Sequence, residues 1–447
     1  MKKLFSLFFL LIVITGNSQI TGNLKHHAGQ ELTLKGFNDF KPELLSGTTI
    51  DSLGNFMLIY PNGYSGMGIL ETEDKSSMVF VLTEPNLKIT GTHLKEKDSL
   101  TFINTKENST LIQYFKDYGQ RQRASSAWGF LKEEYQKDRV FINQKETLKI
   151  INTELNRLEK EDTNYLNALD KDTYVSWFLP LRKLVNDMPI IFRHKVEQIP
   201  EAIKKFREID FNNPKFKTSG LLRGLIEGHY IMLENMGQTS DSRYAQMNIS
   251  TDYLIGNLSE NKTLLSEVGA HLFDYLEKRS LHKASGYLAV KLLSDDTCGL
   301  EDKLTNKLES YRKLKVGKTA PNITFTDNTK LSERNTNILL VFGTSWCPKC
   351  EEEAIKLNEY YNAWKEKDVE VIYMSIDTDK ADFESAYKNM PWKTDCSFMG
   401  WESQAVKDYH VFATPTYFLL DKDLKIVLRP NSIEQTHSWL NLKITDN

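Results

Sequence analysis

Two cysteines three residues apart, Cys347 and Cys350, constrain the fold of this chain more than any other feature. The residues before them, 337–342, form an apolar run with the length of a buried strand, and residues 348–367 after them have a helical pattern. Pro348 suits the first position of that helix, where its missing N–H costs nothing. Cys347 would then lie at the helix N-terminus, with Cys350 one turn further along.

This placement gives the two thiols different chemistry. The free N–H groups and the positive dipole end of the helix would point at Cys347 and favour its thiolate, which is the nucleophile in disulfide exchange. Lys349 adds a nearby cation. Cys350 would be placed to attack a mixed disulfide formed on Cys347. The pattern therefore predicts thiol–disulfide exchange.

Strands and helices alternate around this motif, and the alternation predicts a mixed sheet covered by helices on both faces over residues 316–447. The predicted strands are 337–342, 369–376, 417–420 and 425–428. The predicted helices are 348–367, 380–388, 404–409 and 432–442.

The rest of the chain predicts a multidomain protein, which its 447 residues also favour. Short period-two strands separated by turn residues predict an all-β sandwich or barrel over 19–106. Apolar residues at helical spacing predict an all-α region over 107–315. Four prolines are expected to separate helices of that region: Pro180, Pro189, Pro200 and Pro214.

The first 18 residues have the layout of a secretory signal peptide. Lys2 and Lys3 precede an apolar run that is too short to span a bilayer, and small residues follow at Gly16 and Ser18. Export to the cell envelope, in a periplasmic setting, is therefore expected; the alternative is an uncleaved anchor. The formal net charge of −3 gives no indication of a nucleic-acid partner.

Two segments carry a resemblance to a known family. Residues 338–350 and 413–421, whose landmark residues lie some 65 positions apart, resemble the active-site segment and the cis-proline loop of the TlpA/ResA family of envelope thioredoxins. The resemblance implies a cis Thr414–Pro415 bond that faces the cysteines and a loop whose backbone pairs with an extended substrate segment. Trp346 and Lys349, beside the cysteines, are expected to contact substrate as well. The β-rich segment resembles the small N-terminal domain of related envelope proteins.

Three positions decide how the chain compares with thioredoxin proper and with the ResA-like proteins. Val341 occupies the position of the buried aspartate of thioredoxin proper. Glu353 matches a glutamate of ResA-like proteins and is the candidate proton carrier for Cys350; alternatively, it belongs to a solvated acidic helix face. Proline comes first, and Lys349 second, between the cysteines, which leaves the direction of electron flow open.

The resemblance implies protein thiols and disulfides as partners and a membrane electron donor or acceptor. No cofactor, metal or nucleic-acid partner is expected. Several alternatives stay open. The cysteine pair could be half of a zinc site or a structural disulfide. The domain could only bind partners, or it could be a peroxidase, for which Thr344 has the right offset but Leu340 replaces a proline. Cys298 and Cys396 are expected to be free and buried, or bridged to each other.

Overall fold

The computed structural model describes residues 18–96, 99–103, 105–294 and 300–444. The predicted signal peptide, except Ser18, and Cys298 lie outside the described residues. The chain divides into two compact units, residues 1–236 and 237–447, so the helices predicted over 107–315 are shared between them. Among the helices of the described part, none is both long enough and apolar enough to cross a membrane.

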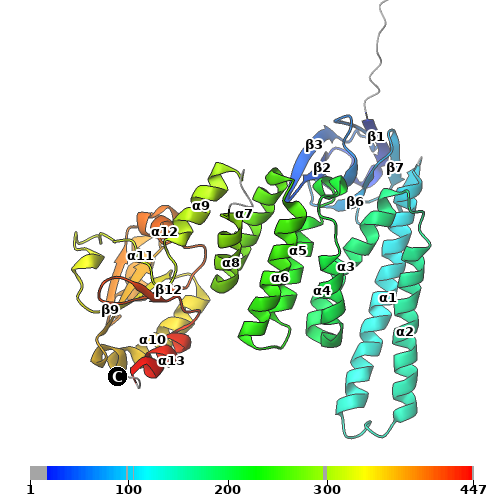
Figure 1. Cartoon of the computed structure of the whole chain (residues 1–447). Coiled ribbons are helices and arrows are strands. Elements are labelled where there is room, and N and C mark those ends of the chain that lie inside the picture. The colour runs from blue at the N-terminus through cyan, green and yellow to red at the C-terminus, as the bar shows by residue number, and fades with distance from the viewer. Residues whose placement is uncertain (1–17, 97–98, 104, 295–299, 445–447) are drawn as a thin grey trace, which may run out of the picture. The chain divides into compact units, whose positions relative to one another are not determined.

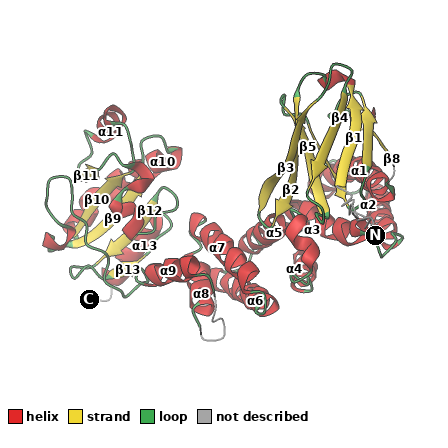
Figure 2. Ribbon diagram, turned by 90° about the horizontal axis from the view of Figure 1, so that it is seen from above, coloured by secondary structure: helices red, strands yellow, loops and turns green. Residues whose placement is uncertain are grey.

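The first unit begins with a β-sandwich, as the period-two pattern predicts. Two four-stranded sheets, ordered β4-β1-β7-β8 and β3-β2-β5-β6, enclose one apolar core that includes Leu34, Leu58 and Phe80 (Figure 2). The strands are β1 Ser18–Leu24, β2 Glu31–Asn38, β3 Lys41–Thr49, β4 Asn55–Tyr60, β5 Gly66–Thr72, β6 Ser77–Leu82, β7 Leu87–Gly91 and β8 Thr101–Ile103.

Among the described residues of this unit, five α-helices follow the strands, and the first two form a long antiparallel hairpin (Figure 1). They are α1 Lys106–Lys137, α2 Lys145–Asn167, α3 Tyr174–His194, α4 Ile199–Arg207 and α5 Leu222–Glu234. Thr105 and Thr173 cap α1 and α3 by accepting backbone N–H groups.

The expectation that Pro180 and Pro189 separate helices is wrong, because both lie inside α3. A proline in a helix interior removes a backbone hydrogen bond and costs about 3 kcal/mol. The helix offsets this cost by burying apolar side chains along its length: Val175, Phe178, Leu179, Met188 and Ile191. Pro200 and Pro214 do lie at helix starts, in α4 and in a short 3-10 helix, Pro214–Thr218.

The second unit opens with helices that pack successively against one another: α6 Ser240–Leu258, α7 Lys262–Lys278, α8 His282–Leu292 and α9 Asp302–Arg312. A five-stranded sheet follows in the order β11-β10-β9-β12-β13, in which β9, β10 and β11 are parallel to one another, β12 is antiparallel to β9, and β13 is antiparallel to β12. Its elements are β9 Asn337–Gly343, α10 Pro348–Glu366, β10 Val369–Ser375, α11 Lys380–Tyr387, β11 Lys393–Cys396, α12 Gln404–Asp408, β12 Thr416–Leu420, β13 Ile426–Leu428 and α13 Ile433–Ile444.

Alternate residues of β9 fill two different cores, which confirms the predicted sheet with helices on both faces. Leu340 and Phe342 face a core shared with α12. Leu339 and Val341 face the opposite core, shared with α10, α11 and α13. Because successive strand side chains point to opposite faces, a continuous apolar strand predicts burial on both sides. Strand β11 is an addition that the sequence pattern did not predict.

Candidate active site

Cys347 is the N-cap residue of α10, and its sulfur accepts the backbone N–H of Cys350 at 3.2 Å. Pro348 occupies the first turn, as predicted. Both cysteines are buried and free, so the structure represents the dithiol form. The strand-to-helix junction thus holds one sulfur at the helix N-terminus and the other one turn inside the helix.

The environment of Cys350 keeps its thiol protonated. Burial, followed by its hydrogen bond with Cys347, raises the pKa of Cys350 to about 12. Desolvation disfavours the charged thiolate of Cys350 because only 2% of the residue is exposed. The thiolate form of Cys350 is therefore strongly disfavoured at neutral pH in this structure.

The loop before β12 lies against the cysteines. The Thr414–Pro415 peptide bond is cis, as the resemblance implied. The thiol of Cys347 donates to the carbonyl oxygen of Thr414, with the sulfur and oxygen 3.6 Å apart. The structure therefore brings the two landmark segments, which are 67 residues apart at this contact, to one place.

Glu353 does not belong to a solvated acidic face, because only 3% of the residue is exposed. One carboxylate oxygen accepts from Tyr417 Oη at 3.2 Å and from Ile433 N at 2.8 Å. The other lies 3.2 Å from Lys349 Nζ and 3.3 Å from Lys356 Nζ. Burial favours the protonated acid, but these donors outweigh it and lower the pKa of Glu353, so the group is ionised at neutral pH.

The two other predicted contact residues differ in accessibility. Trp346 is 63% exposed beside Cys347. Lys349 lies 3.2 Å from carboxylates of both Glu352 and Glu353, so its charge is partly neutralised by neighbours on its own helix. Lys349 therefore offers the Cys347 sulfur less net positive charge than the sequence alone indicates.

Asp377, which the sequence analysis did not single out, holds the segment before Cys347. Its buried carboxylate accepts from Thr344 Oγ1 at 3.0 Å, from Ser345 N at 3.1 Å and from Ser375 Oγ at 2.6 Å. The position had a signal in the sequence, because Asp377 follows the predicted strand 369–376 and ligands of parallel sheets gather at the carboxyl ends of strands. The hydroxyl of Thr344 is thus directed to Asp377, which does not favour the peroxidase role considered for it.

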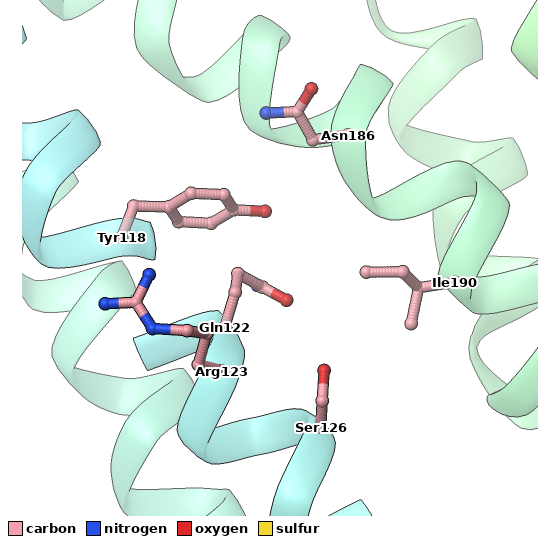
Figure 3. A pocket seen from close by; sticks show the side chains of 6 residues that line it. All are labelled: Tyr118, Gln122, Arg123, Ser126, Asn186 and Ile190. Carbon is pink, nitrogen blue, oxygen red and sulfur yellow. The ribbon is translucent and has the colours of Figure 1, made fainter. Parts of the chain in front are cut away.

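A cavity of about 530 Å³ adjoins Cys350. Its lining includes Thr344, Ser345, Tyr387, Met390 and Pro391. A second pocket, of about 550 Å³, lies in the first unit between α1 and α3, where Figure 3 shows its six lining side chains. They are Tyr118, Gln122, Arg123, Ser126, Asn186 and Ile190. Only the first of these two pockets is next to a thiol.

One cluster of potential metal ligands occurs among the described residues, and it lies in the β-sandwich rather than at the cysteines. Its members, His27, Asp74 and His93, have ligand atoms within 4.8 Å of one another. Leu94 N donates to His27 Nε2, and Lys95 N donates to His93 Nδ1. In the neutral ring of His27 the proton then lies on Nδ1, the nitrogen 3.9 Å from Asp74 Oδ2. A metal-binding histidine donates from the nitrogen that does not face the metal, so His27 does not show that pattern.

Comparisons with known proteins place the similarity in the C-terminal domain. Residues 335–426 match a family model described as thioredoxin-like. The thiol-disulfide oxidoreductase ResA of Bacillus thuringiensis subsp. konkukian (strain 97-27) is 36% identical over 123 residues, which are 26% of this chain and 69% of that protein. A ResA of Bacillus cereus is 36% identical over 144 residues, 30% of this chain and 80% of that protein. A solved thiol-disulfide oxidoreductase from Bacteroides fragilis NCTC 9343 is 29% identical, with a TM-score of 0.26, over 28% of this chain and 99% of its own.

Proposed function

This chain belongs to the ResA-like thioredoxin family and is a thiol-disulfide oxidoreductase, and from that premise we propose that Cys347 and Cys350 exchange disulfides with protein partners. The thiolate of Cys347 attacks one sulfur of a partner disulfide. The partner's S–S bond breaks, its second sulfur leaves and takes a proton, and a mixed disulfide remains on Cys347. Cys350 then loses its proton and attacks the Cys347 sulfur. The partner leaves as a dithiol, reduced by two electrons, and Cys347–Cys350 is oxidised to a disulfide.

The observation that carries this proposal is the placement of Cys347. Its sulfur caps α10, accepts the N–H of Cys350, and faces the carbonyl of Thr414 in the cis-proline loop. A helix N-terminus stabilises a thiolate. The backbone of the Thr414–Pro415 loop is the element we propose to pair with an extended partner segment.

Glu353 is proposed to take the proton of Cys350 when the mixed disulfide is resolved. Its carboxylate is ionised and lies one turn beyond Cys350 on α10. Its position between two lysines and Tyr417 holds the carboxylate in one orientation.

The site of action is proposed to be the cell envelope, on the basis of the leader-like residues 1–18. In that setting a dithiol that reduces partners must be re-reduced, and a disulfide that oxidises them must be re-oxidised. A membrane electron donor or acceptor would meet that need. Domain boundaries at residues 18, 106 and 315 are part of the same proposal, with the regions before 316 assigned to partner selection.

The reduction potential of the Cys347–Cys350 couple, measured in the full chain by equilibration against glutathione and dithiothreitol buffers, tests the proposal. A value of about −270 mV would indicate a reductase, and a value of about −120 mV would indicate an oxidant. Cys396→Ser removes another buried thiol of the same domain and should leave the potential unchanged. The absence of a reversible two-electron couple would refute the exchange function and leave a structural disulfide.

A further inference from the structure

We propose that Met399 and Trp401, together with Trp346, form a docking surface for a large apolar side chain that lies close to the reactive cysteine of a polypeptide substrate. This inference rests on the proposed exchange function and adds a preference among its substrates. It is carried by three exposed apolar side chains at one edge of the sheet and by the contacts that hold them there.

The three residues share an edge because of the strand order. Strands β9, β10 and β11 are parallel neighbours, so their carboxyl ends meet at the same edge of the sheet. The segment that leads to Trp346 and Cys347 follows β9, Asp377 follows β10, and residues 397–402 follow β11. The unpredicted strand β11 is therefore what brings Met399 and Trp401 to the active-site edge.

Contacts with Asp377 and Thr378 hold the segment before Cys347 and residues 397–402 close together. The N–H of Ser345, the residue before Trp346, donates to the Asp377 carboxylate at 3.1 Å. On the other side, the thiol of Cys396 donates to the Asp377 carbonyl, with the atoms 3.3 Å apart. Gly400 lies against Thr378, since a Cβ atom added to it would be 2.9 Å from Thr378 Cγ2.

Gly400 also shows that this loop conformation is specific. Its φ of +56° lies in the left-handed region, where glycine is favoured. Met399 and Trp401 flank this glycine and project from the surface, with 59% and 42% of each residue exposed; Trp346 is 63% exposed. Large apolar side chains that are exposed at the same edge of a sheet as a reactive group indicate an interaction surface.

The chemistry of the neighbours favours an uncharged occupant. Glu402, next to Trp401, pairs with Lys407 at 2.7 Å. Lys349, on the cysteine side, pairs with Glu352 and Glu353. Indole and thioether groups bury aromatic and aliphatic side chains well. An extended segment bound at the cis-proline loop would place its cysteine at Cys347. Side chains of that segment on the β10 and β11 side of Cys347 would then meet this surface.

The test uses the reduced full-length protein and short peptides that carry one cysteine as a mixed disulfide with glutathione. The peptides differ only in the two residues before the cysteine, which are phenylalanine, serine or lysine. The rate of glutathione release is measured for the wild type, for the double variant Met399→Ser/Trp401→Ser, and for Leu53→Ala. Leu53 is a matched control because it is 71% exposed in the other unit. Reduction of a small aromatic disulfide checks each protein for working cysteines.

We expect the wild type and Leu53→Ala to prefer the phenylalanine peptide over the serine peptide about 10-fold, equivalent to about 1.4 kcal/mol. The double variant should reduce this preference to less than about 2-fold. Equal rates for all peptides in the wild type, an equally fast lysine peptide, or a preference that survives in the double variant would each overturn the inference. Failure of the wild type to reduce even the small disulfide would instead refute the exchange function itself.

Discussion

Arg429 Nη2 donates to Glu277 Oε2 at 3.0 Å, across 152 residues of sequence, and joins the α7 helix to the sheet that carries the cis-proline loop. The side chains are 6% and 2% exposed. Tyr311 Oη accepts from Arg429 Nη1 at 2.6 Å and donates to Glu277 Oε1 at 2.7 Å. The guanidinium also lies 5.0 Å from the ring centroid of Phe418, in β12. Helices α6–α9 and the thioredoxin-like sheet are therefore one packed unit.

Replacement of Arg429 by methionine should destabilise this unit by about 3 kcal/mol, because it leaves the Glu277 carboxylate buried without its cation. Urea unfolding of the full chain, followed by the fluorescence of its tryptophans, measures the change. Arg312→Met is the matched control, since the Arg312–Glu309 pair is about half exposed, and it should change the free energy of unfolding by less than about 0.5 kcal/mol. Equal effects of the two variants would contradict the structure.

The same network should weaken at acid pH. Burial favours protonated Glu277, but His282, Arg429 and Ser285 reverse this effect and lower its pKa. A carboxyl whose pKa is lower in the folded state than in the unfolded state stabilises the folded protein at pH values above the unfolded pKa, about 4.3. This contribution is lost as the pH falls from that value towards the folded pKa. Burial and Arg429 lower the pKa of His282, so protonation of this histidine is less favourable in the folded state than in the unfolded state. The folded state therefore loses stability as the pH falls below about 6.5, the ordinary pKa of histidine. Unfolding measured from pH 8 to pH 3 should show this decline, and Glu277→Gln should flatten the part below pH 5. An unchanged profile in that variant would contradict the assignment.

Cys350 should resist alkylation in the folded protein. With its pKa raised to about 12 by burial, the thiolate fraction at pH 8 is at least about 100-fold below that of an unfolded cysteine. Iodoacetamide at pH 8, followed by tryptic mass mapping, separates Cys347 from Cys350 because Lys349 lies between them. We expect label on Cys347 and almost none on Cys350 until urea is added. Similar labelling of both cysteines in the native state would contradict the predicted low reactivity of Cys350.

Glu353→Gln should slow the release of a partner from the mixed disulfide at least about 10-fold and change the pH dependence of that step, because an amide cannot take the Cys350 proton. Single-turnover release from a preformed mixed disulfide measures this step. Tyr417→Phe is the control, since it removes one hydrogen bond to Glu353 but keeps the carboxylate. If Glu353→Gln lowers stability but leaves the pH dependence unchanged, Glu353 is an anchor and not a proton carrier.

Asp377→Ala should lower both stability and activity. It leaves donors from Thr344, Ser345 and Ser375 without their acceptor, which costs about 2 kcal/mol. Asp395→Ala is matched in burial and removes an acceptor for Thr326, so it should cost a similar amount of stability. Only Asp377→Ala should lower kcat/KM for peptide disulfides, because only Asp377 holds the segment before Cys347. Equal losses of activity in Asp377→Ala and Asp395→Ala would show that Asp377 has only a structural role.

Much of the active site follows from local sequence. Cys347, Pro348 and Cys350 are neighbours in the chain, and one helical turn decides their geometry, so their spacing predicts a capped dithiol. The buried strand at 337–343 and the surrounding alternation predict the mixed sheet, because burial on two faces requires continuous apolar strands. The resemblance at Thr414–Pro415 correctly implied the cis bond.

What only the tertiary structure decided depends on contacts between distant residues. No local pattern shows that Glu353 is buried among lysines, that Asp377 holds Ser345, or that Arg429 pairs with Glu277. The prolines inside α3 show the same limit, because packing of the whole helix outweighs a local cost. Short-range chemistry determined which groups can react. The free energy of long-range burial, which no window of sequence contains, determined what surrounds them.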